Sequence, residues 1–145
     1  MPQANNNNTG QKTITLPNKL EELSRLNAFV DEICEEHGCD MDMTMRMNLA
    51  MEEAVVNVID YAYPIGTEGE ITIHLMSDGS SIRFQIIDEG VAFDPTAKEK
   101  ADTSLSAEDR QIGGLGILLV RELMDTINYE RENGQNVLTL IKNLK

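Results

Sequence analysis

An acid and an amide stand four residues apart inside a long stretch of helical pattern. They are Glu53 and Asn57, and because a helix turns once in about 3.6 residues, the two positions project to the same side. An amide oxygen is a hard ligand that suits Mg²⁺, and a nearby carboxylate can take the proton of a hydroxyl that attacks a phosphoryl group. A solvated Glu and an Asn that bonds locally have the same spacing, so the pair alone does not establish the chemistry.

A second acid stands where a strand pattern ends. Asp88 follows the alternating segment 82–87, and Gly90 comes two residues later. A carboxylate at a strand end can accept a hydrogen bond from the exocyclic amine of adenine. Glycine removes the side chain that would block a ligand from approaching the backbone. A plain strand-end turn has the same pattern, so this motif is also ambiguous by itself.

A third motif is glycine-rich and comes just before the apolar run Ile117–Val120. It contains Gly113, Gly114 and Gly116, with Leu115 between the last two. The free backbone donors of a helix N-terminus, together with the helix dipole, favour a phosphate group. The motif is not a Rossmann fingerprint, because no βαβ unit surrounds it, and it is not a P-loop, because no Gly-Lys-Ser/Thr follows.

Read together and in this order, the three motifs predict a nucleotide pocket with a metal position. With them the chain resembles the GHKL ATPase superfamily, and within it the bacterial anti-sigma-factor serine/threonine kinases. Residues 53–63 resemble the N box of that family, residues 88–93 its first glycine box and residues 114–116 its second. The resemblance covers about residues 13–144, which is nearly the whole chain.

The resemblance implies a role for each matching position. Glu53 would be the general base, and Asn57 would be the Mg²⁺ ligand at the nucleotide. Asp88 and Thr139 would lie around the adenine. The other nucleotide contacts would come from Gly90, Gly113, Gly114, Leu115 and Gly116.

Two positions depart from the family pattern. Tyr61 stands where the family often has His, and Ile112 stands where it often has Arg. Arg110, two residues before Ile112, could reach the γ-phosphate of a bound nucleotide or be an exposed lid residue. These departures bear on catalytic strength more than on nucleotide binding.

Periodicity predicts the elements that must position these motifs. Alternating patterns predict strands at 12–16, 70–75, 82–87, 126–130 and 136–141. Asp78-Gly79 and Asn133-Gly134 are turn signals that predict a hairpin between each of the last two pairs of strands. Apolar stripes predict helices at about 18–37, 40–61 and 114–124. Asn18, with Glu21 three residues on, and Asp40 are expected to cap the first two helices.

This order of elements predicts an α+β fold. We expect a two-layer α/β sandwich with a mixed, mainly antiparallel sheet and helices on one face, and the resemblance implies that it is a Bergerat-type ATP-binding fold. Residues 1–10, which are Asn-rich, are expected to be a disordered tail. Residues 11–145 are expected to form a single ATP-binding kinase domain, with the polar segment at about 94–112 as its lid.

Charge and composition argue against several classes of function. Lys and Arg total 12 against 25 for Asp and Glu, a net charge of −13, which argues against non-specific nucleic-acid binding and against an anionic membrane surface. No run of 18 apolar residues occurs and the N-terminus does not resemble a signal peptide, so we expect a cytoplasmic protein that does not span a membrane. Cys34 and Cys39 lack a second pair that would complete a metal site.

The favoured hypothesis follows from the resemblance. It is an ATP- and Mg²⁺-dependent regulator that binds a sigma factor and phosphorylates a Ser or Thr of a small antagonist protein. The resemblance also suggests a homodimer. Two alternatives stay open: a protein-binding switch that uses ATP without significant phosphoryl transfer, and a detached histidine-kinase-like module that acts on another chain. Glu53 favours the kinase, whereas Ile112 favours the switch.

Overall fold

The computed structural model describes residues 10–96 and 114–144. Its strands are β1 (Gln11–Pro17), β2 (Glu70–Ser77), β3 (Ser81–Asp88), β4 (Thr126–Glu132) and β5 (Gln135–Asn143). Its helices are η2 (Leu20–Glu22), α1 (Leu23–Glu36), α2 (Met41–Asn57), η3 (Val58–Ala62) and α5 (Gly114–Leu123). None of the helices in these two stretches is long and apolar enough to cross a bilayer.

The five strands form one sheet in the order β1-β2-β3-β5-β4. Every pairing between these described strands is antiparallel. The turn between β2 and β3 contains Gly79 with φ of +88°, and the turn between β4 and β5 contains Asn133 and Gly134 with φ of 54° and 77°. In the second of these turns, positive φ at both central residues matches the twist of paired strands, as in a tight hairpin. The hairpins predicted at these two places are confirmed.

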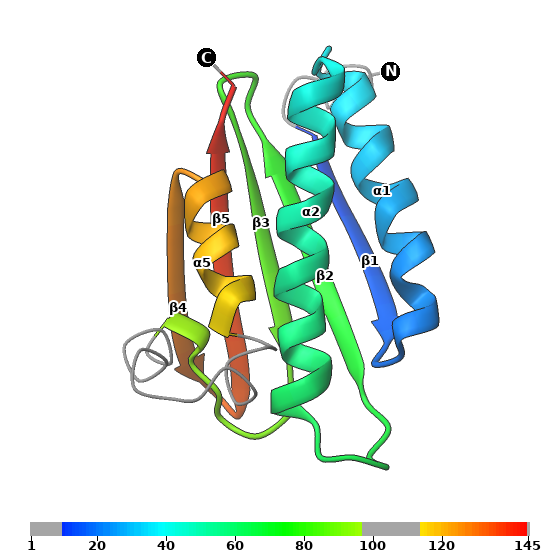
Figure 1. The fold of residues 1–145 in the computed structure, drawn as a ribbon, viewed down its shortest axis with the longest axis vertical. Coiled ribbons are helices and arrows are strands. Elements are labelled where there is room, and N and C mark those ends of the chain that lie inside the picture. Colours follow the sequence, from blue (N-terminus) through cyan, green and yellow to red (C-terminus); the bar gives the residue numbers. More distant parts are fainter. Residues whose placement is uncertain (1–9, 97–113, 145) are drawn as a thin grey trace, which may run out of the picture.

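All three α-helices cover one face of the sheet, which we call the inner face (Figure 1). Strand side chains alternate between buried and more accessible positions, as the pleat of a half-covered sheet requires. In β3 the buried side chains are Ile82, Phe84, Ile86 and Asp88. In β5 they are Asn136, Leu138 and Leu140. Two polar residues, one on each of these strands, therefore lie in line with apolar side chains on the inner face.

Helix α2 begins as predicted and ends in an unpredicted way. Asp40 caps it, because its Oδ1 accepts a hydrogen bond of 2.8 Å from the backbone N–H of Met43. After Asn57 the chain continues for one more turn as the π-helix η3. Short π segments often occur at functional sites, and this one joins Asn57 to the loop that packs against the end of β3.

Asn18 does not cap the first helix, which corrects the prediction. The cap position before η2 is Lys19, with no side-chain cap bond. The Asn18 amide instead donates to the carbonyl of Thr67 at 2.9 Å and accepts from the N–H of Gly69 at 3.0 Å. These bonds to a distant loop satisfy the side chain better than a cap within its own segment.

The predicted fold class is confirmed. The described residues form an α+β sandwich of two layers, a sheet and the helices on its inner face, and the sheet is antiparallel throughout. The expected tail lies outside the described residues except for Gly10, whose carbonyl accepts from the N–H of Ser77 at 2.9 Å. Most of the expected lid, residues 97–112, also lies outside them.

Candidate functional site

Asp88 is a buried acid at the end of β3, with 2% of its surface exposed. Its Oδ1 accepts one hydrogen bond of 2.8 Å from the N–H of Gly90 and another of 2.8 Å from Nδ2 of Asn136. Burial raises the pKa of Asp88, because the charged form loses its hydration, while the two hydrogen bonds oppose the shift. Both bonds that it accepts from described residues end on Oδ1, so Oδ2 remains available to a ligand.

Asn136, which sequence reasoning missed, is the residue that faces Asp88 across the β3–β5 pair. Its Nδ2 donates to Asp88 and, at 2.8 Å, to the carbonyl of Val91. Its Oδ1 accepts from the N–H of Phe93 at 3.2 Å and from the hydroxyl of Tyr129. Asn136 thus ties Asp88, Val91 and Phe93 of the first glycine motif to β5.

Thr139, the residue assigned to the adenine position, lies elsewhere. It pairs with Gln85 of β3 and Asn128 of β4. Because side chains along a strand alternate between the two faces, Thr139 is on the outer face, whereas Asn136 and Asp88 are on the inner face. The structure therefore does not bring Thr139 and Asp88 together on one face of the sheet, as a shared place around adenine requires.

Asn57 lies near the end of α2 with 2% of its surface exposed. Its Nδ2 donates to the backbone carbonyl of Glu53 at 2.9 Å. Its Oδ1 is buried and has no hydrogen-bond partner among the described residues. An unpaired buried oxygen costs about 1–3 kcal/mol, and such cases call for an explanation such as an ion or a ligand.

Glu53 is half-buried on the same helix, one turn before Asn57. Loss of hydration raises the pKa of its carboxyl group, and repulsion by Glu52 adds to the shift. A carboxylate with a raised pKa is a better proton acceptor near neutral pH than an ordinary one. Its position and its electrostatics both suit the predicted role of a base.

Gly90 lets the turn after Asp88 press against the end of η3. A Cβ built at Gly90 would lie 2.2 Å from the carbonyl oxygen of Ala62, and the next residue, Val91, donates its N–H to that same oxygen at 2.7 Å. Alongside this contact, the rings of Tyr61 and Phe93 stack with their centroids 5.0 Å apart. Gly90 is thus required for close backbone packing. Its predicted contact with the nucleotide stays a prediction.

A small inner cavity of about 10 Å³ lies between α2 and the sheet. The side chains around it come from α2, from the turn after β3, and from strands β4 and β5. They include Asn57, Asp88, Phe93, Tyr129 and Asn136. Pockets that hold small molecules measure about 300–1,000 Å³. A nucleotide can therefore occupy this place only if some of the lining side chains move apart.

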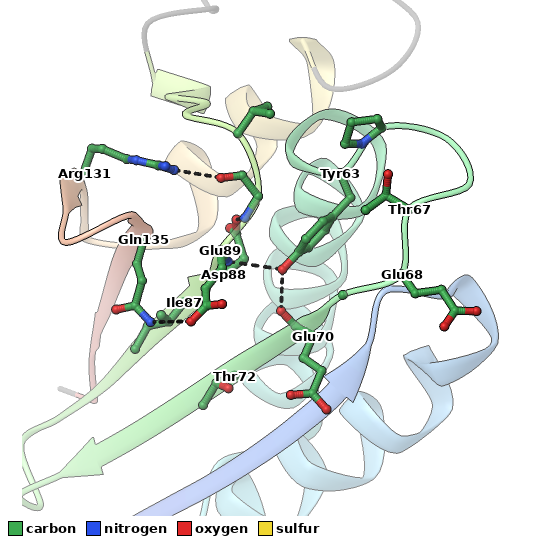
Figure 2. A pocket seen from close by; sticks show the side chains of 14 residues that line it. Tyr63, Thr67, Glu68, Glu70, Thr72, Ile87, Asp88, Glu89, Arg131 and Gln135 are labelled. Atoms are coloured by element: carbon green, nitrogen blue, oxygen red, sulfur yellow. Dashed lines mark hydrogen bonds between the residues drawn. The ribbon is translucent and has the colours of Figure 1, made fainter.

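A larger cavity of about 720 Å³ lies on the other side of the Asp88–Val91 turn (Figure 2). The hydroxyl of Tyr63 accepts from the N–H of Glu89 at 3.2 Å and donates to the carbonyl of Glu70 at 2.7 Å. Arg131 donates to the carbonyl of Gly90 at 2.9 Å. Asp88 and Gly90 line this cavity, whereas Asn57 and Asn136 do not, so it shares only the first glycine motif with the inner cavity.

The second glycine box begins α5. Gly114 is the first residue of that helix, and Leu115 and Gly116 follow within its first turn. The first turn of α5 lies toward the same end of the molecule as the C-terminal end of α2 (Figure 1), as a shared phosphate site requires. Arg110 and Gly113 lie outside the described residues, so their assigned contacts stay predictions.

The family described as the histidine kinase-like ATPase domain matches residues 16–142. The chain belongs to this family. The family assignment covers all three motifs and the strands between them.

Named relatives of this histidine kinase-like ATPase domain are serine kinases. This chain is 32% identical over 138 residues to the serine-protein kinase RsbW of Halalkalibacterium halodurans, and the match covers 91% of this chain and 82% of that kinase. It is 28% identical over 130 residues to RsbW of Listeria monocytogenes, covering 87% and 83%. It is 33% identical over 94 residues to the serine/threonine-protein kinase BtrW of Bordetella bronchiseptica, covering 65% and 66%. The predicted resemblance to the anti-sigma-factor serine kinases of the GHKL superfamily is thereby confirmed.

A solved structure has the same fold. The RsbU and RsbW domains of a Mycobacterium tuberculosis protein superpose with a TM-score of 0.65 at 19% sequence identity. The match covers 92% of this chain and 32% of that one. At this identity the likeness supports the fold of the ATPase domain and nothing finer.

Proposed function

We propose that this chain binds ATP with Mg²⁺ and transfers the γ-phosphoryl group to a Ser or Thr of a small antagonist protein, and that it also binds a sigma factor. The observation that carries the proposal is the buried Oδ1 of Asn57, which has no partner among the described residues. It lies one helical turn from Glu53, an acid whose pKa is raised. The names of the relatives support the reaction class and the choice of a protein as substrate.

The donor set at Asn57 fits Mg²⁺. An amide oxygen is a hard ligand, and Mg²⁺ usually keeps several waters and needs only one or two protein ligands besides phosphate oxygens. No group of three or more His, Cys, Asp or Glu side chains within the described stretches could hold a metal ion, and this mode of binding needs none. When bound, the ion would neutralise charge on the phosphates.

The protein's own groups account for the remaining steps. Asp88 would orient the nucleotide by accepting from the adenine amine. The hydroxyl oxygen of the protein substrate attacks the γ-phosphorus, the bond from that phosphorus to the bridging oxygen breaks, and ADP leaves. Glu53 takes the proton of the attacking hydroxyl, which contributes about 10²–10⁴-fold in rate in typical cases.

The test is transfer of labelled phosphate from ATP to small candidate antagonists encoded by the same organism. Glu53→Gln removes the proton acceptor and preserves the size of the side chain, so it should slow transfer about 10²–10⁴-fold while ATP affinity stays unchanged. Glu130→Gln, which removes an exposed acid from β4, is the matched control and should transfer at the wild-type rate.

Two outcomes would change the proposal. Equal transfer rates in Glu53→Gln and wild type would mean that the base is another group. If wild type transfers no phosphate to any antagonist but binds a sigma factor only in the presence of ATP, the chain is a switch and not a kinase.

A further inference from the structure

The carboxamide of Asn136 uses its full hydrogen-bonding capacity within the protein. It has two N–H groups and an oxygen with two lone pairs. The N–H groups go to the Asp88 carboxylate and the Val91 carbonyl, and the oxygen accepts from Phe93 and Tyr129. The side chain is only 4% exposed, so it has no group left with which to bind a ligand directly.

The partners of Asn136 fix the orientation of its amide. The carbonyl of Val91 can only accept and the backbone N–H of Phe93 can only donate. The nitrogen of Asn136 must therefore face Val91, and its oxygen must face Phe93. The same nitrogen, Nδ2 of Asn136, faces Asp88, so Asp88 meets a hydrogen-bond donor.

The bond to Asp88 controls which carboxylate oxygen meets a ligand. Asn136 and the N–H of Gly90 both bind Oδ1. Oδ2 accepts nothing from the residues that the structure describes, and Asp88 lines the inner cavity. Asn136 therefore holds the carboxylate in one rotamer, with a pure acceptor left for the ligand.

We propose that Asn136 is a positioning residue that makes the site select adenine over guanine, by holding Asp88 in this orientation and fastening the Val91–Phe93 segment to β5. The proposal rests on the proposed binding of ATP. A fixed acceptor suits the amine of adenine and repels the carbonyl oxygen that guanine has at the same place. Asn136 does this through Asp88, without touching the base.

The experiment measures the dissociation constants of ATP and of GTP, each with Mg²⁺, and thermal melting for every variant. Asn136→Asp keeps the shape and the oxygen that binds Phe93 and Tyr129, but it replaces the donor to Asp88 by a second acceptor. Asn128→Asp, the same change on the exposed outer face of β4, is the matched control. Tyr129→Phe removes one bond to Asn136 and leaves Asp88 untouched.

Wild type is expected to prefer ATP to GTP. Asn136→Asp should weaken ATP binding by about tenfold or more, the usual worth of a hydrogen bond to a charged group, while GTP binding falls less, so that the preference shrinks. Tyr129→Phe should shift the preference in the same direction by a smaller factor, and Asn128→Asp should leave it unchanged.

An unchanged ratio of ATP to GTP affinity in a folded Asn136→Asp variant would overturn the proposal. This includes an equal proportional loss of both affinities together with a lower melting temperature, since that describes a merely structural residue. If Asn136→Asp does not fold, an unchanged ratio in Tyr129→Phe is decisive. Failure of wild type to bind either nucleotide is distinct from these, because it refutes ATP binding itself.

Discussion

At the scale of single residues, Asp88 has a charge that works against folding. Burial raises its pKa in the folded chain, so at neutral pH the ionised form destabilises the fold relative to an unfolded chain in which the group is hydrated. The penalty is present above the folded pKa and disappears as the pH falls through it toward the ordinary value for Asp, about 3.9. A buried acid that costs stability is a candidate for function.

Asp88→Asn separates these two effects. The new amide oxygen can still accept from Gly90 and Asn136, so the melting temperature at pH 7 should stay equal or rise, and any gain should vanish near pH 4. ATP affinity should fall about tenfold or more, because the acceptor for the adenine amine becomes a donor. Melting curves at the two pH values and calorimetric titration with ATP check both parts. Unchanged ATP affinity would remove Asp88 from the adenine site.

At the scale of elements, the π-helical turn η3, which continues α2, and the turn after β3 meet at one backbone contact. The π-helical turn η3 ends at Ala62, whose carbonyl receives the N–H of Val91. Gly90 can approach this carbonyl only because it lacks a side chain. The contact holds the segment with Asn57 and the segment with Asp88 in fixed relation.

Gly90→Ala should disturb that relation. The added methyl group would meet backbone atoms, which cannot rotate away, so we expect a loss of stability of about 1–3 kcal/mol and weaker ATP binding. Gly66→Ala is the control: Gly66 has a positive φ of 87°, so an alanine there is strained, but its Cβ meets nothing within 4 Å. It should lower the melting temperature only and leave ATP affinity unchanged. Equal ATP affinity in wild type and in Gly90→Ala would contradict the role of the contact.

The elements were predictable wherever local chemistry decided them. Asp40 as a cap and the Asn133-Gly134 turn depend on neighbouring residues only, and both predictions are confirmed. The predicted Asn18 cap is wrong because bonds to a loop 49 and 51 residues away override a local cap. Resemblance points to Thr139, although the alternation through Leu138 and Leu140 indicates that Asn136 shares the inner face.

At the scale of the whole molecule, three separate parts of the chain converge at one end of the sandwich. Helix α2 brings Asn57, β3 brings Asp88, and β5 brings Asn136 to the lining of the inner cavity. These residues are far apart in the sequence, and the pairing of β3 with β5 brings Asp88 and Asn136 opposite each other. The inner cavity measures about 10 Å³, against about 300–1,000 Å³ for typical small-molecule pockets, so we expect nucleotide binding to move its lining side chains apart.

The most direct test is calorimetric titration with ATP in the presence of Mg²⁺ and in its absence, for wild type and for Asn57→Ala. If the buried Oδ1 of Asn57 is a magnesium ligand, removal of Mg²⁺ should weaken ATP binding to wild type by about tenfold or more, and Asn57→Ala should bind weakly under both conditions. Asn128→Ala, an exposed Asn on β4, should behave as wild type. The same Mg²⁺ dependence in wild type and in Asn57→Ala would contradict the account.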